Sequence, residues 1–228
     1  MKKGKMIELS HRMIPGQENF KLETRTFDVT ELMPEVKHRP DIWYVLSDIT
    51  FSSHMGTHVE FPYHHWQKGA DAANYPLKNL IGEAVVLDFS RKKNGEAITL
   101  KELQRKAKTA VKKGDIVFIR TDMDKLFRTK RWAEQPYLTV EAMDWLIETS
   151  KPKVIGTDAS GFEVPGTDYQ PNHLNMFKHK IAMVESATNL AAIGKERVRV
   201  FILPLPIEGI DSCPVRIVAL TKGYLCND

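Results

Sequence analysis

The segment 54–64 concentrates histidine and carboxylate side chains more densely than any other part of the chain, with His54, His58, Glu60 and His64. Neutral imidazole and carboxylate are ligands of Zn²⁺, Mn²⁺ and Fe²⁺, and three such ligands with one open coordination position make a metal catalytic. A histidine-rich surface loop is the alternative interpretation. The close spacing, interleaved with Gly, Thr and Pro, favours a metal site.

The spacing within this segment predicts how its side chains are presented. Four positions lie two residues apart, so in an extended segment they point to one side: His58, Glu60, Pro62 and His64. Gly56 permits a turn that brings His54 back beside His58. Pro62 cannot donate to a sheet ladder, which favours an edge or a strand end that opens onto a cavity. His65 falls out of phase, and we expect it to be a supporting or surface residue rather than a ligand.

Two further candidate ligands lie downstream, His173 and Glu185. Glu185 ends an apolar run, and a buried carboxylate is costly unless it is paired, hydrogen-bonded or bound to a metal. His173 follows a loop rich in Gly, Pro and Asp, a type of segment that often carries function. Each alone fits a structural role equally well. Together with the first cluster they would complete a binuclear site, in which two metals share a bridging carboxylate. The expected ligands are His54, His58 and Glu60 on one ion, and Glu60, His173 and Glu185 on the other.

The elements that must position these residues are predicted as short strands alternating with helices. Continuously apolar stretches such as 84–87 and 116–119 are typical of strands covered on both faces. The predicted strands span residues 6–10, 21–28, 43–50, 84–89, 115–120, 153–157, 180–184, 199–205 and 215–221.

Helix signals lie between these strands. Thr99 and Glu102 form a capping box, Thr139 caps an apolar stripe that begins at 140, and residues 187–193 form a third, shorter helix. The alternation predicts an α/β fold with a mixed β-sheet core flanked by helices.

The bulk properties exclude several classes. A chain of 228 residues fits a single domain, 1–228, with a sizeable core. The net charge of +4 comes without a nucleic-acid motif, and the apolar runs are too short for a membrane span. The N-terminus lacks the apolar region of a signal peptide. Cys213 and Cys226 make no disulfide framework, so we expect a cytoplasmic protein acting on a small molecule, with no nucleic-acid or membrane partner.

Residues 54–64 resemble the signature H-x-G-T-H-x-D-x-P-x-H of the cyclase family of metal-dependent hydrolases, which includes kynurenine formamidase and isatin hydrolase. The match is complete except at Glu60, where the family usually has Asp. The spacing from His173 to Glu185 is also similar to that of the family, as are the segments 7–11, 185–190 and 203–216. The resemblance therefore extends over nearly the whole chain.

The resemblance implies a swivelling β/β/α fold, usually assembled as homodimers or homotetramers. It implies the same division of ligands between two divalent ions, Zn or Mn, with His54, His58 and Glu60 on one and His173 and Glu185 on the other. His64 corresponds to the family's catalytic histidine. Glutamate at position 60 is one methylene longer than aspartate, so it either bridges two ions at an altered separation or leaves one ion weakly held.

The expected reaction is hydrolysis of a C–N bond in an aryl formamide or cyclic amide by metal-activated water. One alternative keeps the metal but makes the protein a cyclase, dehydratase or lactonase acting on another carbonyl compound. A further alternative is a catalytically weak protein that binds metal or a small ligand. The aromatic residue expected in the substrate pocket is Trp66, because it follows the histidine segment.

Overall fold

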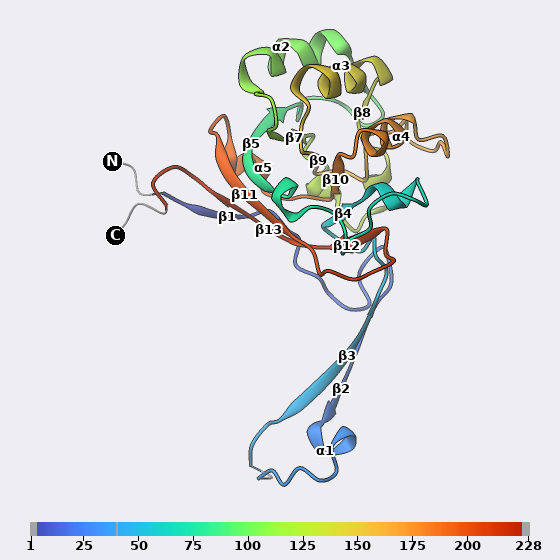
Figure 1. Ribbon diagram of the computed structural model, residues 1–228, viewed down its shortest axis with the longest axis vertical. Coiled ribbons are helices and arrows are strands. Elements are labelled where there is room, and N and C mark those ends of the chain that lie inside the picture. The colour runs from blue at the N-terminus through green and yellow to red at the C-terminus, as the bar shows by residue number, and fades with distance from the viewer. Residues whose placement is uncertain (1–3, 40, 225–228) are drawn as a thin grey trace.

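A nine-stranded mixed sheet forms the body of the protein in the computed structural model, which describes residues 4–39 and 41–224 (Figure 1). The strand order is β1-β13-β11-β5-β7-β9-β10-β4-β12. In that order the strands are Met6–Glu8, Arg216–Leu220, Val198–Leu203, Ile81–Asp88, Ile116–Arg120, Val154–Thr157, Ala182–Glu185, His58–Glu60 and Ser212–Pro214.

The centre of the sheet is parallel and its two sides are antiparallel. Strands β5, β7, β9 and β10 run parallel to one another, while β4 and β12 on one side and β11, β13 and β1 on the other pair antiparallel. The apolar run in β7 is fully buried from Ile116 to Ile119, as its sequence predicts for a strand covered on both faces. The predicted α/β class with a mixed sheet is confirmed.

Two apolar clusters lie on the two faces of this curled sheet. The outer one packs β5, β7 and β9 against α2 (Leu100–Ala110), α3 (Val140–Ser150) and α4 (Pro171–Lys178) (Figure 1). The inner one includes Phe61, Phe118 and residues of the short helix α5 (Leu190–Ile193). Helices therefore cover the middle of the sheet, where the parallel strands are.

The predicted helix starts are present. The Glu102 carboxylate accepts a hydrogen bond from the Thr99 backbone N–H at 3.0 Å, and Thr139 accepts one from the Ala142 N–H at 3.4 Å. The sequence did not predict α4 or β12, which are short, and it predicted β4 only as part of an extended segment that runs on to His64. It also missed several minor elements, namely η1 (Pro62–His64), η2 (Leu77–Asn79), η3 (Met123–Leu126), η4 (Lys130–Ala133) and the pair β6 (Ala97–Ile98) and β8 (Tyr137–Leu138).

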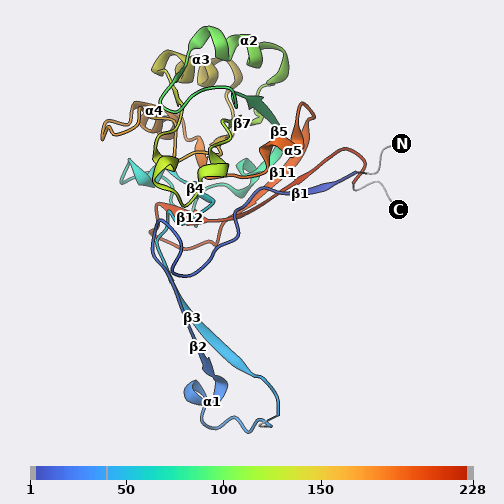
Figure 2. The same cartoon turned by 180° about the vertical axis from the view of Figure 1, so that it is seen from behind.

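Strands β2 (Leu22–Asp28) and β3 (Val45–Phe51) form a two-stranded arm that projects away from the body (Figures 1 and 2). The short helix α1 (Val29–Leu32) lies near its tip. Both strands were predicted, but they pair only with each other and do not join the main sheet. Pairing with the other strand satisfies the inward-facing backbone groups of each strand, and the outward-facing groups on both edges are left to water.

None of the helices in the described part of the chain has the length and apolar character that a bilayer crossing requires. Cys213 is a buried free cysteine in β12, and Cys226 lies outside the described residues.

Candidate metal centre

Strands β4 and β10 bring three of the predicted ligands to one place. His58 and Glu60 lie two residues apart on β4, so both side chains emerge on the same face, while Val59 between them packs into the inner cluster. The antiparallel pairing sets Glu185, at the end of β10, directly opposite His58. The predicted alternation is confirmed for His58 and Glu60.

The alternation does not continue to His64. The strand ends at Glu60, and Pro62 begins the 3₁₀ helix η1. The prediction that His64 shares an extended face with His58 is therefore wrong, because a turn of three residues replaces the two-residue repeat. His64 nevertheless lies beside His54, with 4.7 Å between the ring centroids.

The predicted turn before β4 is present. Gly56 has a φ of 60°, in the left-handed region that favours glycine. The turn places the His54 ring 5.1 Å from that of His58, between centroids. The third imidazole comes from the first turn of α4, which carries His173.

The five predicted ligands meet around the Glu60 carboxylate. Its Oε1 lies 3.0 Å from Nδ1 of His54 and 3.4 Å from Nε2 of His58. Its Oε2 lies 3.7 Å from Nε2 of His173. Glu185 spans the same two sides, with its oxygens 3.4 Å from Nε2 of His58 and 3.6 Å from Nε2 of His173. Oε1 of Glu60 therefore faces His54 and His58, and Oε2 faces His173. A carboxylate shared by two ions would need two such sides.

Each of these imidazoles turns its other ring nitrogen toward an oxygen acceptor. The distances are 2.8 Å from His54 Nε2 to Asp211, 2.8 Å from His58 Nδ1 to the Gly56 carbonyl, and 2.7 Å from His173 Nδ1 to Glu163. An outer N–H held in this way leaves a lone pair on the inner nitrogen. Histidine ligands of metals show the same arrangement.

The residues fit a divalent cation. His58 and Glu60 are 1 % and 2 % exposed. Among the described residues, His58 Nε2 and Glu60 Oε2 have no hydrogen-bond partner, although both are buried. Leaving buried polar atoms without partners is costly, and a cation between them would satisfy both. Imidazole nitrogen and carboxylate oxygen are the donors that Zn²⁺ and Mn²⁺ accept.

Without a metal, the same groups hold protons. Burial opposes a charged imidazole, but attraction to the facing carboxylates of Glu185 and Glu60 outweighs it and raises the pKa of His58 to about 10. The pKa of His54 rises to about 9 and that of His173 to about 10, because their carboxylate partners likewise outweigh burial. Burial raises the pKa of Glu60, but attraction to the facing imidazoles of His54 and His58 outweighs it and leaves this pKa well below its usual range.

Asp211 joins His54 to His64. Its Oδ2 lies 2.8 Å from His54 Nε2 and 2.7 Å from His64 Nδ1, and Ser53 donates to Oδ1 at 3.0 Å. The hydrogen bonds from His54 and His64 hold the pKa of Asp211 far below its usual range, so it is ionised. An ionised acceptor on Nδ1 leaves Nε2 of His64 free to take a proton.

A cavity of about 420 Å³ opens over this centre, lined by His54, Glu60, His64, His173, Glu185 and residues of the loop before α4. The pocket aromatic is Phe20 rather than Trp66, which is half exposed and does not line the cavity. The prediction for Trp66 is wrong because η1 turns the chain away after His64. His65 Nε2 lies 2.6 Å from Gln170 Oε1, and its ring stacks on the ring of His173. This position is the one expected for a residue that supports a ligand.

Three contributors to the centre escaped sequence reasoning. Asp211 and Glu163 hold the outer nitrogens of the histidines, and Gly161 leaves room for Glu185. Asp211 falls within the segment 203–216 that resembles the family, which was its only signal. Glu163 and Gly161 lie in the loop before α4 and match no local motif.

Comparison with known proteins identifies the family of the chain. The Cyclase family model matches residues 7–164. Kynurenine formamidase of Erythrobacter litoralis (strain HTCC2594) is 28 % identical over 87 % of this chain and 82 % of that protein. Cyclase-like protein 1 of Arabidopsis thaliana is 26 % identical over 95 % and 85 %. Isatin hydrolase A of Ralstonia solanacearum shares the fold, with a TM-score of 0.80 at 20 % identity over 96 % and 92 % of the two chains. The chain therefore belongs to the Cyclase family, whose description is putative cyclase.

We expect Zn²⁺ or Mn²⁺ binding to release protons near neutral pH. The raised pKa values keep His54, His58 and His173 protonated in the metal-free protein until the pH passes about 9 to 10. Ligation needs neutral imidazole, so binding at about pH 7 expels about two to three protons per chain and tightens as the pH rises. Calorimetry in buffers of different ionisation enthalpy counts these protons. Metal binding without proton release would contradict the assignment of imidazole ligands.

We expect Gly161→Ala to weaken metal binding. Gly161 has a φ of 126°, and a Cβ there would lie 2.9 Å from Glu185 Oε1. Displacement of that carboxylate should lower metal affinity by roughly 10- to 100-fold. Gly166→Ala is the matched control, since Gly166 lies in the same loop with a φ of 78° and open space around it. Equal metal affinity in the two variants, measured by competition with a chelator, would show that contact with Glu185 is unimportant.

Proposed function

We propose that this protein hydrolyses a C–N bond of an aryl formamide or cyclic amide, using two divalent ions per chain, Zn or Mn. A small-molecule substrate and a cytoplasmic location are part of the proposal. The observation that carries it is the placement of His64, with Nδ1 held by Asp211, beside a cluster of three imidazoles and two carboxylates.

His54, His58 and Glu60 would hold one ion, and Glu60, His173 and Glu185 the other. A divalent ion bound there supplies Lewis acidity, which polarises a carbonyl group and lowers the pKa of a bound water from ~16 to roughly 7. The contribution of the chain is the fixed geometry of the ligands. Each imidazole is oriented by an oxygen acceptor behind it.

His64 acts as the general base and then as the general acid. Its Nε2 takes a proton from the attacking water as the oxygen bonds to the carbonyl carbon. The C–N bond then breaks, and the same proton passes to the leaving nitrogen, which gives a carboxylic acid and an amine. Asp211 keeps the N–H on Nδ1 and stabilises the imidazolium between the two transfers.

The cavity supports an aryl carbonyl substrate. Phe20 offers an aromatic surface 6.5 Å from the ring of His54, between centroids. Ser160 and Gln135 also line the cavity, and Ser160 donates a hydrogen bond to Gln135 at 2.8 Å, so the wall carries polar as well as aromatic groups. The relatives named kynurenine formamidase and isatin hydrolase point to the same class of substrate by their names.

We expect His64→Ala to retain its metal and to lose turnover by about 10²- to 10⁴-fold, because the proton relay is removed. Turnover of an aryl formamide, a lactam and a lactone should be measured for the wild type and the variant, together with metal content. His179→Ala is the control, since His179 is exposed at the end of α4. Loss of metal in His64→Ala would make His64 a ligand. Turnover of the lactone alone would favour the lactonase alternative.

We expect two ions per chain in both the wild type and Glu60→Asp. The two oxygens of Glu60 face separate imidazoles, so a bridging role fits this side chain, and aspartate is the usual family residue. Elemental analysis of protein purified without chelators counts the ions. One ion in the wild type and two in the variant would mean that Glu60 makes the site mononuclear. No bound transition metal in either would overturn the proposed function.

A further inference from the structure

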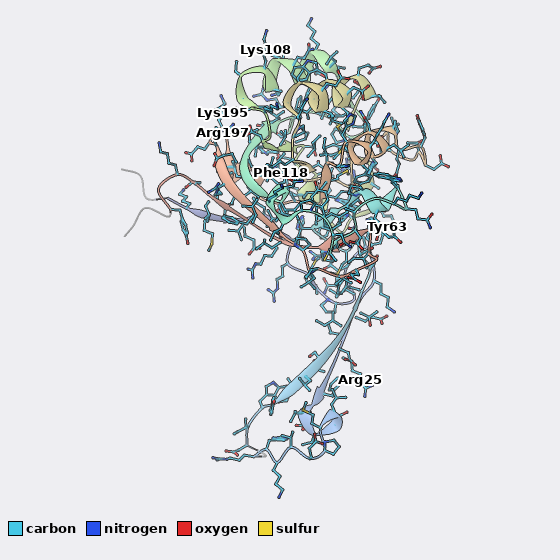
Figure 3. All side chains as sticks on the ribbon, in the orientation of Figure 1. Arg25, Tyr63, Lys108, Phe118, Lys195 and Arg197 are labelled. Carbon is cyan, nitrogen blue, oxygen red and sulfur yellow. The ribbon has the colours of Figure 1, made fainter. Side chains whose placement is uncertain are left out.

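Helix α4 and the 3₁₀ helix η1 each carry a histidine of the site, and they contact each other beside it. The last residue of η1 is His64, and His65 follows as its C-terminal cap. Gln170 immediately precedes α4, whose first turn carries His173. Figure 3 shows Tyr63 of η1 at the edge of the body, below the position of α4 in Figure 1. The packing of η1 against α4 therefore brings His65 beside Gln170.

His65 fixes the orientation of the Gln170 amide. Nε2 of His65 lies 2.6 Å from Oε1 of Gln170. An amide oxygen only accepts, so the imidazole nitrogen carries the hydrogen and donates it. The ring of His65 is itself held by His173, with 5.5 Å between centroids and 12° between planes, and by Phe177, also at 5.5 Å. The oxygen of Gln170 therefore has a partner whose position is set by packing.

The nitrogen of the same amide has no such partner. A glutamine side chain offers one acceptor oxygen and two N–H donors. Among the residues that the structure describes, none accepts a hydrogen bond from Nε2 of Gln170. Gln170 is partly exposed and lines the cavity over the metal centre, whereas His65 does not line it. With its oxygen turned to His65, the amide presents its NH₂ group to the cavity.

The second amide on the cavity wall is already engaged at both ends. Oε1 of Gln135 accepts the hydrogen bond from Ser160 at 2.8 Å, and Nε2 of Gln135 donates to the Glu163 carbonyl at 3.3 Å. The Glu163 carboxylate in turn lies 2.7 Å from Nδ1 of the ligand His173. Gln135 is therefore part of the scaffold that holds the ligands. Of the two wall amides, Gln170 is the one with an uncommitted NH₂ group.

An uncommitted NH₂ group at this position suits an acceptor oxygen of a substrate. The amide is neutral, so it donates to a ketone, amide or carboxylate oxygen alike. Gln170 lies one imidazole ring away from the ligand His173, because His65 contacts both. An oxygen bound by this amide must therefore be close to the bond that is cleaved.

We propose that Gln170 selects the substrate, by donating a hydrogen bond from its NH₂ group to an acceptor oxygen outside the cleaved group. His65 is a positioning residue, which holds the oxygen of Gln170 and so keeps the NH₂ group turned to the cavity. The inference rests on the proposed function, since it adds a second point of recognition to the same substrate. Phe20 supplies an aromatic surface on the cavity wall, and Gln170 supplies the polar contact.

The test compares two aryl formamides that differ by one acceptor group, formanilide and its ortho-acetyl derivative. The readout is the ratio of kcat/KM for the ortho-acetyl compound to that for formanilide. We expect Gln170→Leu, which removes the donor and keeps an uncharged side chain, to lower this ratio by roughly 3- to 10-fold, the contribution of one neutral hydrogen bond. Loss of metal or of folding lowers both rates together and leaves the ratio unchanged. Gln67→Leu is the matched control, since Gln67 is exposed and does not line the cavity.

Two variants of His65 test its positioning role. We expect His65→Phe, which retains a ring to stack on His173 but has no donor, to lower the ratio in the same direction as Gln170→Leu. His65→Gln restores an N–H donor and should recover part of the ratio. In the double variant His65→Phe with Gln170→Leu, the ratio should fall no further than in Gln170→Leu alone, because both changes remove the same contact. Additive losses would overturn the role of His65.

A ratio that is unchanged in Gln170→Leu, or that falls equally in Gln67→Leu, would overturn the proposal. If the wild type cleaves neither formamide, the proposed function fails, and binding then tests Gln170 by itself. Calorimetry on the Zn²⁺-loaded protein compares aniline with ortho-acetylaniline. We expect the wild type to bind ortho-acetylaniline the more tightly and Gln170→Leu to lose that preference. Equal affinity of the wild type for the two amines would overturn the role of Gln170.

Discussion

Two carboxylates enclosed in the protein interior set the main constraint on this structure. Glu60 and Glu185 are almost fully buried, and each opposes ionisation of the other. Burying such charges is costly unless they are paired or bound to a metal. His54, His58 and His173 surround them for this reason, and each imidazole needs its own acceptor behind it. The acceptors are Asp211 for His54, the Gly56 carbonyl for His58 and Glu163 for His173.

The register of the sheet brings these carboxylates, imidazoles and acceptors together. Strand β4 lies between β10 and β12, with Glu185 opposite His58 on one side and Ser212 opposite Glu60 on the other. Asp211, immediately before β12, is thereby brought to the imidazoles. A slip of one residue in either pairing would turn the ligands into the inner cluster, because side chains alternate along a strand. Val59, on the opposite face of β4, packs into the inner cluster and so helps to keep the ligands oriented toward the cavity.

The arm and the cavity are joined in sequence. Few residues of the arm are buried, and its strands pair only with each other. Phe20, two residues before β2, and His54, three residues after β3, both line the cavity. The arm therefore begins and ends at the wall of the metal centre.

The sequence by itself determined the elements and ligands that depend on local order. The apolar run at 116–119, the capping box at Thr99 and the ligand spacing of His58 and Glu60 all act within a few residues. Tertiary structure decided the rest. The 3₁₀ turn at Pro62 ended the alternation that was expected to reach His64. Asp211 contacts His54, which lies 157 positions earlier in the chain. Strands β2 and β3 form a separate arm, although nothing in their sequences distinguishes them from strands of the main sheet. Such contacts depend on how distant strands pair, and short-range periodicity carries no information about that pairing.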